Sequence, residues 1–245
     1  MGVTRQRPPR LLELDGETVT VLVRESTRAR SLRVRLGPEL PLEAIVPRRV
    51  ADAELDRFLH DRRDWIARKL AETRAGAARA NRLGLNRPDV VWIGLTPIPI
   101  ELGDARSPRL RHGRLVVGPG PQAVGAVERW YRRQARERIG RVVAREAARL
   151  GVRPGTLAIR DPKTRWGSCS SRGTIGFSWR LVIAPLDVLE YVVVHELCHL
   201  RELNHGKRFW RLLEDARPGW RHEAGWLREH GLELSAYRIA LTASS

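Results

Sequence analysis

The order of apolar and polar residues in the first fifty positions is typical of short β-strands. Between Ser31 and Leu36, apolar residues alternate strictly with other residues, mostly arginine, so one face of the segment is apolar and the other is charged. Two apolar runs of similar length flank it, at Thr18–Arg24 and Pro41–Val46. Because consecutive strands usually pair with their neighbours, these three segments predict a small antiparallel meander.

Apolar residues at intervals of three and four predict two long amphipathic helices, Ala51–Thr73 and Gln122–Leu150. Gly151 follows the second helix, and glycine commonly ends a helix at that position. Residues 75–88 are rich in Ala, Gly and Arg and are expected to form a connection. Three strand-like segments lie between the helices: Val90–Ile93, Thr96–Leu102 and Leu115–Val117. The middle segment contains two prolines, which predicts that it lies at a sheet edge.

The pattern then changes to two short strands, Leu157–Arg160 and Thr174–Arg180, which bracket a loop over residues 163–173. Asp187 is expected to cap the next helix, which runs to about Leu203 and is almost wholly apolar in its first half, so it should be central and buried. Two further helices are predicted, at about Lys207–Ala216 and Trp220–His230.

These elements predict an α+β fold with three parts. Residues 1–17 form an irregular leader, residues 18–121 a strand-and-helix portion, and residues 122–245 a mainly helical portion. The boundary between the last two is soft and lies at Gly118–Pro121, where glycine and proline interrupt the pattern.

Composition and charge narrow the class of protein. Of the 245 residues, 42% are hydrophobic, which is enough for a sizeable core. No stretch approaches the ~20 apolar residues of a membrane span, and we expect no membrane partner. The formal net charge of +17 is compatible with non-specific binding to nucleic acid. Only three of the 45 basic residues are lysine, and arginine-biased codon usage explains that as well as a binding surface does. Nucleic acid is therefore the less favoured partner.

Two features point to a reducing compartment. The two cysteines are too few for a disulfide framework, and the basic N-terminus lacks the apolar run of a secretory signal. We therefore expect a cytoplasmic protein.

The most specific pattern is His195-Glu196-Leu-Cys-His199, followed by His205 six positions later. On a helix, His195 and His199 are one turn apart and project from one face, as two nitrogen ligands of one tetrahedral Zn²⁺ must. Glu196 is placed to act as a general base on a metal-bound water. If the helix ends near Asn204, the chain can turn back and bring His205 to the same ion. Three protein ligands leave the fourth position to water, as in catalytic zinc sites.

Some roles near the motif stay open at this stage. Glu214 or Glu223, from a later helix, could replace His205 as the third ligand. Cys198 lies inside the motif, but a cysteine three positions after a ligand points away from the metal, so a small buried apolar role is favoured.

The loop before the second strand holds further candidates. Cys169 could pair with a histidine as a nucleophile, although a structural role in a tight turn is favoured. Arg165 and Trp166 are candidates for shaping the mouth of the site or, in the case of Arg165, for stabilising an oxyanion. Trp166 could equally be an anchor in the core.

Four strings together resemble a known family: Arg165-Trp-Gly-Ser-Cys-Ser170, Trp179-Arg-Leu-Val182, the run from Tyr191 to Leu200, and Asn204-His-Gly-Lys-Arg-Phe-Trp210. They are similar to the YgjP-like metallopeptidases, which are SprT- and WLM-related zinc peptidases of the zincin type. The resemblance runs from about residue 21 to 232, which implies one continuous family domain.

The resemblance implies a zincin-like metallopeptidase domain with an N-terminal β-strand and helix portion. It also implies one Zn²⁺ per chain, held by His195, His199 and His205, with Glu196 as the catalytic base. Two positions depart from the family pattern, because Gly206 stands where a serine is expected and Ser178 where asparagine is frequent.

We therefore expect a zinc metallopeptidase that hydrolyses peptide bonds with a metal-activated water and a glutamate base, on a peptide or protein substrate. The strand Thr174–Trp179 is the candidate edge for holding that substrate in an extended form. Two alternatives remain: a nucleic-acid-associated protein with a structural or vestigial zinc site, and a zinc hydrolase of non-peptide amides. The salt dependence of DNA binding would separate the first from a peptidase.

Overall fold

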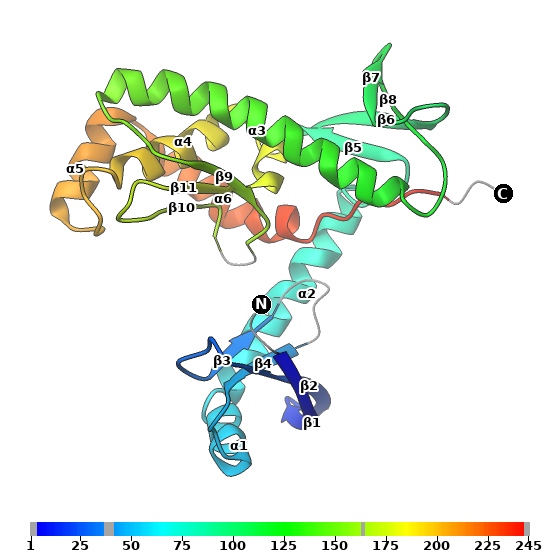
Figure 1. The fold of residues 1–245 in the computed structure, drawn as a ribbon, viewed down its shortest axis with the longest axis vertical. Helices are drawn as coiled ribbons and strands as arrows, with labels where there is room; N and C mark the ends of the chain where they lie inside the picture. Colours follow the sequence, from blue (N-terminus) through cyan, green and yellow to red (C-terminus); the bar gives the residue numbers. More distant parts are fainter. Residues whose placement is uncertain (1–3, 37–41, 163–164, 243–245) are drawn as a thin grey trace. The chain divides into compact units, whose positions relative to one another are not determined.

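The computed structural model describes residues 4–36, 42–162 and 165–242. They divide into two compact units, residues 1–79 and 80–245, and each unit contains both strands and helices (Figure 1). The α+β class predicted from the sequence is therefore confirmed. Among the described residues, no helix is long and apolar enough to cross a membrane.

The first unit is a four-stranded sheet with a helix packed against it. The strands are β1 (Thr4–Leu14), β2 (Glu17–Ser26), β3 (Arg33–Arg35) and β4 (Leu42–Pro47), in the order β1-β2-β4-β3. β2 and β4 are parallel neighbours, and β3 pairs with the outer side of β4. The predicted antiparallel meander is therefore wrong, because β4 inserts between β2 and β3. Val21, Val23, Ala44 and Val46 alternate into the core of this unit, where Leu55 and Ile66 of the following helices meet them.

The prediction of an irregular leader is wrong, because Thr4–Leu14 forms the strand β1 and pairs with β2. Asp15 and Gly16 make the turn, both with positive φ (49° and 84°), as a two-residue hairpin turn requires. The register breaks between Arg7 and Arg10, where two prolines interrupt the ladder. Those prolines make the segment look irregular in the sequence, whereas the Asp-Gly pair is the hairpin signal.

The helix predicted at Ala51–Thr73 is divided and extended. It forms α1 (Asp52–Asp61) and α2 (Arg63–Arg82), and Arg62 lies between them with φ −105° and ψ 5°. α2 continues through most of the segment expected to be a connection, since alanine and arginine both favour a helix.

The second unit begins with a four-stranded sheet in the order β5-β6-β8-β7, formed by β5 (Val90–Ile93), β6 (Thr96–Leu102), β7 (Arg109–Arg111) and β8 (Arg114–Val117). β6 is central, but its two prolines pair only with β5, and β8 joins at Ile100. The prolines thus occupy the part of β6 that has one neighbouring strand. The soft boundary predicted at Gly118–Pro121 falls inside this unit.

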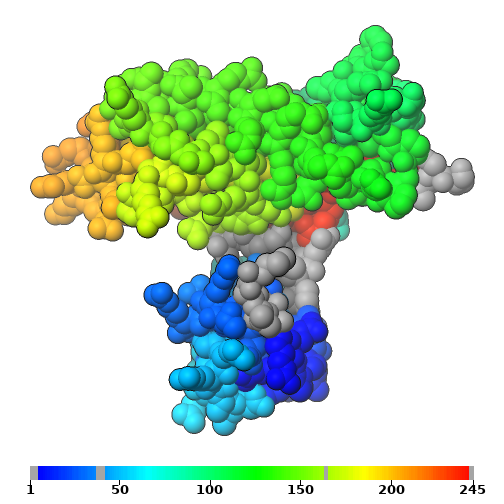
Figure 2. Space-filling model, in the orientation of Figure 1, coloured from blue at the N-terminus to red at the C-terminus, as the bar shows by residue number. Residues whose placement is uncertain are grey.

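The long helix α3 (Ala123–Leu150) organises the rest of the second unit. It ends at Gly151, whose φ of 63° is left-handed, as predicted. Its buried face includes Trp130, Tyr131 and Ile139. It packs against a strand at Leu157–Arg160, a 3₁₀ helix at Trp179–Ile183 and a helix at Leu186–Cys198. Together with the strands that follow it in the chain, α3 forms much of the surface of this unit in the view of Figure 2.

A three-stranded sheet lies beside α3 in the order β10-β11-β9, formed by β9 (Leu157–Arg160), β10 (Gly167–Cys169) and β11 (Ile175–Ser178). β11 pairs in parallel with β9 and antiparallel with β10. β10 lies in the segment predicted as a loop and is an edge strand of this sheet. The remaining helices are α4 (Leu186–Cys198), α5 (Lys207–Ala216) and α6 (Trp220–Ser235).

Candidate active site

The motif lies at the C-terminal end of α4, which is the central helix of the unit. Val193, Val194 and Leu197 are fully buried, as the apolar run predicted. α4 begins two residues earlier than expected, with Pro185 and not Asp187 as its N-cap. The Asp187 carboxylate therefore lies within the first turn, where it accepts a hydrogen bond from Val188 N (2.9 Å).

α4 also ends earlier than predicted, at Cys198, so His199 is its C-cap. The chain then reverses through a turn in which Gly206 N donates to the carbonyl of Asn204 (2.8 Å). Asn204 makes this turn without a positive φ. The reversal nevertheless brings His205 back to the end of α4.

Three imidazole rings converge at this point. The candidate ligand nitrogens of His195, His199 and His205 all lie within 4.8 Å of one another, and the Nε2 atoms of His195 and His205 are 3.0 Å apart. Glu214 and Glu223, the alternative third ligands, are engaged elsewhere. Glu214 accepts a hydrogen bond from the indole of Trp220, and Glu223 forms an ion pair with Arg217.

The state of the rings fits a divalent metal. His199 Nδ1 donates to the carbonyl of Glu202 (3.0 Å), which leaves the Nε2 lone pair free to coordinate. Burial, with the neighbouring His199 and His205, lowers the pKa of His195 to about 3, so that ring is neutral at pH 7. The Nε2 atoms of His195 and His205 face each other at hydrogen-bond distance, and a bound cation would accept a lone pair from each of them. The three histidines are therefore a suitable donor set for zinc.

Glu196 lies directly against the edge strand β10. Its side chain is buried, and an ideal Cβ placed on Gly167 would lie 2.5 Å from its Oε1 atom, so only glycine permits this contact. Burial raises the pKa of Glu196 to about 7, and the positive charge of Arg165 opposes the shift. A cation bound by the histidines would oppose it further, since it favours the carboxylate.

A cavity of about 410 Å³ opens over these groups, and we call it the histidine cavity. Its walls are the three histidines, Glu196, the β10 strand and a largely apolar set of side chains: Arg165, Trp166, Tyr191, Val192, Leu203 and Leu227. Both predicted mouth residues therefore line it. The Trp166 side chain also packs on α6: a Cβ added at Gly231 would lie 3.3 Å from the indole Nε1 atom. The backbone carbonyl of Trp166 accepts a hydrogen bond from Ser178 N (2.9 Å). Arg165 is exposed.

An aromatic group behind the histidines was not predicted as part of the site. Phe209 of α5 is fully buried, and its ring stacks on His199 with centroids 4.5 Å apart. The ring centroid of Trp210 lies 5.4 Å from that of His205 and 5.0 Å from that of Trp220, on which it stacks. The spacing of Phe209 and Leu213 on the amphipathic α5 indicates a buried face, but nothing in it indicates that this face packs on the histidines.

The two cysteines are free thiols. Burial raises the pKa of Cys198 to about 11, and this residue lies outside the histidine group, which agrees with the expected apolar role. Cys169 lines the histidine cavity, where burial and the nearby Glu196 raise its thiol pKa. A protonated thiol is a poor nucleophile, so the structural role predicted for Cys169 is the one that this arrangement favours.

Comparison with known proteins adds independent evidence. A family model described as YgjP-like, metallopeptidase domain, matches residues 30–230. Among solved structures, the crystal structure of the metallopeptidase zymogen of Pyrococcus abyssi abylysin is similar at 23% identity, covering 42% of this chain and 99% of that chain with a TM-score of 0.35. No curated protein matches the chain. Because the family model spans most of the sequence, the chain belongs to the YgjP-like family of metallopeptidases.

Proposed function

We propose that this metallopeptidase is zinc-dependent and of the His-Glu-x-x-His type, with His195, His199 and His205 holding the ion and Glu196 acting as the general base. The observation that carries the proposal is the convergence of three imidazole nitrogens beside the buried carboxylate of Glu196 on the wall of one cavity.

Each histidine has a distinct place in holding the ion. His199 is oriented by its bond to the Glu202 carbonyl and by the Phe209 ring, so its Nε2 atom is fixed. His205 arrives from the turn after α4 and is exposed, which leaves the cavity side of the group open. A zinc ion bound there would act as a Lewis acid toward the scissile carbonyl and the attacking water.

Glu196 would move the proton. A carboxylate beside the ion can accept a proton from the attacking water and then donate it to the leaving amine. The close packing of Gly167 on the carboxylate limits its movement and excludes water from that side. Arg165 is retained as the candidate for stabilising the oxyanion, since its charge acts on the same cavity.

The substrate would lie along β10. The strand Thr174–Trp179, expected to be the substrate-binding edge, contains β11, which is paired on both sides by β9 and β10 and has no free edge. β10 is the edge strand, and it lines the histidine cavity. An extended peptide could therefore add to β10 as a further strand and present its backbone to the site.

The first experiment is elemental analysis of the purified protein beside the His205→Ala variant, with casein hydrolysis measured for both and for Glu196→Ala. We expect about one zinc per chain in the wild type, weaker retention in His205→Ala, and retained zinc without hydrolysis in Glu196→Ala, because that residue is not a ligand. Full hydrolysis by Glu196→Ala would rule out Glu196 as the general base. Unchanged zinc in His205→Ala would remove this residue from the ligand set.

A further inference from the structure

The sheet β10-β11-β9 has two chemically different faces. Ile175 and Phe177 of β11 are buried on the face that packs toward the helices, and Gly167 faces Glu196 on that side. The side chains at the alternate positions of these strands point to the opposite face of the sheet, which we call the outer face. The register aligns Ser168, Gly176 and Ala158 in one row across the three strands, so the outer face carries small and polar groups.

A second cavity of about 280 Å³ lies on this outer face, and we call it the outer cavity. Its lining includes the polar side chains of Arg160, Arg165, Ser168, Ser170 and Thr174, together with Pro162, Gly176 and Phe177. Gly176 is buried at its floor, and a Cβ there would be 3.0 Å from the Ser168 hydroxyl. The absence of a side chain at this position keeps the cavity open.

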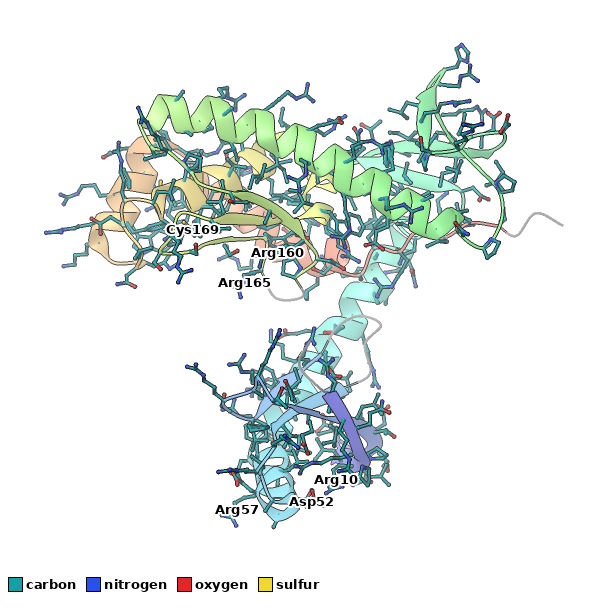
Figure 3. All side chains as sticks on the ribbon, viewed as in Figure 1. Arg10, Asp52, Arg57, Arg160, Arg165 and Cys169 are labelled. Atoms are coloured by element: carbon teal, nitrogen blue, oxygen red, sulfur yellow. The ribbon has the colours of Figure 1, made fainter. Side chains whose placement is uncertain are left out.

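Two guanidinium groups of this cavity are without a carboxylate partner. Arg160 is exposed at the end of β9 and Arg165 precedes β10, and neither forms an ion pair with a carboxylate in the described parts of the chain. Other arginines of the same unit are paired, such as Arg217 with Glu190 and Glu223. Figure 3 labels Arg160 and Arg165 together with Cys169, and all three gather at this sheet. The cavity is therefore cationic and supplied with hydroxyl donors.

The two cavities meet at β10. Arg165, Gly167, Ser168 and Cys169 line both of them. Successive side chains of an extended strand point to opposite faces. A peptide lying along β10 would therefore direct one side chain toward the histidine cavity and the next toward the outer cavity.

We propose that the outer cavity is a specificity subsite that takes an acidic side chain of the peptide substrate, with Arg160 and Arg165 as its positive groups. This rests on the proposed function only in assuming that the substrate lies along β10. Arginine matches a carboxylate with paired hydrogen bonds, and the Ser168 and Thr174 hydroxyls add donors beside it. The apolar walls of the histidine cavity are suited to an uncharged side chain, so the preferred substrate carries the two kinds of residue on opposite faces of one strand.

The experiment digests a proteome-derived peptide library with zinc-loaded wild type, Arg160→Gln and Arg111→Gln. Arg111 on β7 is exposed and lines neither cavity, so its variant controls for the loss of one charge. Mass spectrometry of the cleaved peptides should show aspartate and glutamate enriched at one fixed position near the cut bond. We expect Arg160→Gln to lower that enrichment by about tenfold and Arg111→Gln to leave it unchanged.

Cleavage without acidic enrichment, or enrichment that persists in Arg160→Gln, would overturn the subsite while leaving the peptidase proposal intact. Should no peptide be cleaved, a second readout applies: fluorescence anisotropy with a labelled Thr/Val-rich nonapeptide that carries a central Glu, beside its Gln twin. Tighter binding of the Glu peptide, lost in Arg160→Gln, would support the subsite without any activity. Equal affinity would overturn it, as would binding of a dT oligonucleotide at physiological salt that depends on Arg160, which would assign the cavity to nucleic acid.

Discussion

Two buried glutamates of the second unit have opposite electrostatic surroundings. Glu146 on α3 and Glu196 on α4 are each 6% exposed. Burial alone raises the pKa of Glu146, but hydrogen bonds from Arg145 (2.8 Å) and Arg149 (2.7 Å) outweigh it, and the pKa is lowered. Glu196 has only the more distant charge of Arg165, and its pKa is raised to about 7.

The comparison separates an ion-paired carboxylate from the carboxylate proposed as the general base. Burial disfavours the ionised form of both side chains, and the nearby charged groups then determine whether the pKa is lowered or raised. Glu146 is ionised near pH 7 and its charge is neutralised by ion pairs, so it has no proton to exchange there. Glu196 is packed against Gly167 and forms no ion pair within the described residues, so it stays able to take and release a proton.

The largest effect is expected from Gly167→Ala, which changes the packing of Glu196 without altering any ionisable group. The added Cβ would overlap the carboxylate at 2.5 Å, so the carboxylate or β10 must move. A displacement of about 1 Å at a catalytic group costs roughly 100-fold in rate, and overpacking costs about 1–3 kcal/mol of stability. We expect kcat/KM to fall on that scale, with zinc content unchanged.

Gly125→Ala on α3 is the matched control, because an added Cβ there meets only the flexible end of Arg129 at 3.5 Å. Alanine favours a helix over glycine by about 1 kcal/mol, so this variant should be fully active and slightly more stable. Normal kcat/KM in Gly167→Ala would show that the contact with β10 does not position Glu196.

A smaller effect is expected from Glu146→Gln, measured by urea unfolding and followed by tryptophan fluorescence, since most tryptophans lie in the second unit. A lowered pKa means that the folded state favours the carboxylate, so its contribution is present above pH ~4.5 and is lost as pH falls through the folded-state pKa. Its arginine partners are half exposed, which limits the contribution to about 1–2 kcal/mol. The free energy of unfolding of the wild type should exceed that of the variant by that amount at pH 7, and the difference should shrink as pH falls below about 4.5. A constant difference at all pH values would assign the effect to packing.

The local parts of this picture were predictable from the sequence, whereas the long-range contacts were not. The one-turn spacing of His195 and His199 follows from helix periodicity, and the end of α3 follows from Gly151. The contact of Gly167 with Glu196 joins segments whose packing no period encodes. The stacking of Phe209 on His199 is of the same kind, because an amphipathic helix shows that it has a buried face but not what covers it.

Misread turns and pairings account for the remaining differences. The Asp15–Gly16 turn signal follows two prolines, and these prolines interrupt the apolar pattern, so that the β1 segment looks irregular in the sequence. The order of strands in a sheet depends on which crossover packs best. The parallel pairing of β2 with β4 and of β9 with β11 therefore cannot be predicted from alternation alone. For the same reason the strand Thr174–Trp179, expected to be an edge, contains β11, which has a neighbouring strand on both sides.

The smallest effect is expected from Arg149→Gln, which tests how the ion pairs of Glu146 distinguish it from Glu196. Arg149 donates to Glu146 and also to the carbonyl of Ala216 at the end of α5 (2.7 Å), whereas Arg145 also pairs with Glu190. Removing Arg149 leaves Glu146 one partner, so its pKa should rise toward the ordinary value, with a loss of about 0.5–1 kcal/mol at pH 7. A double-mutant cycle with Glu146→Gln cancels the Ala216 contribution, because that bond is lost in both backgrounds. A coupling energy near zero would mean that Arg145 alone holds the charge of Glu146, and the contrast with Glu196 would then rest on one ion pair.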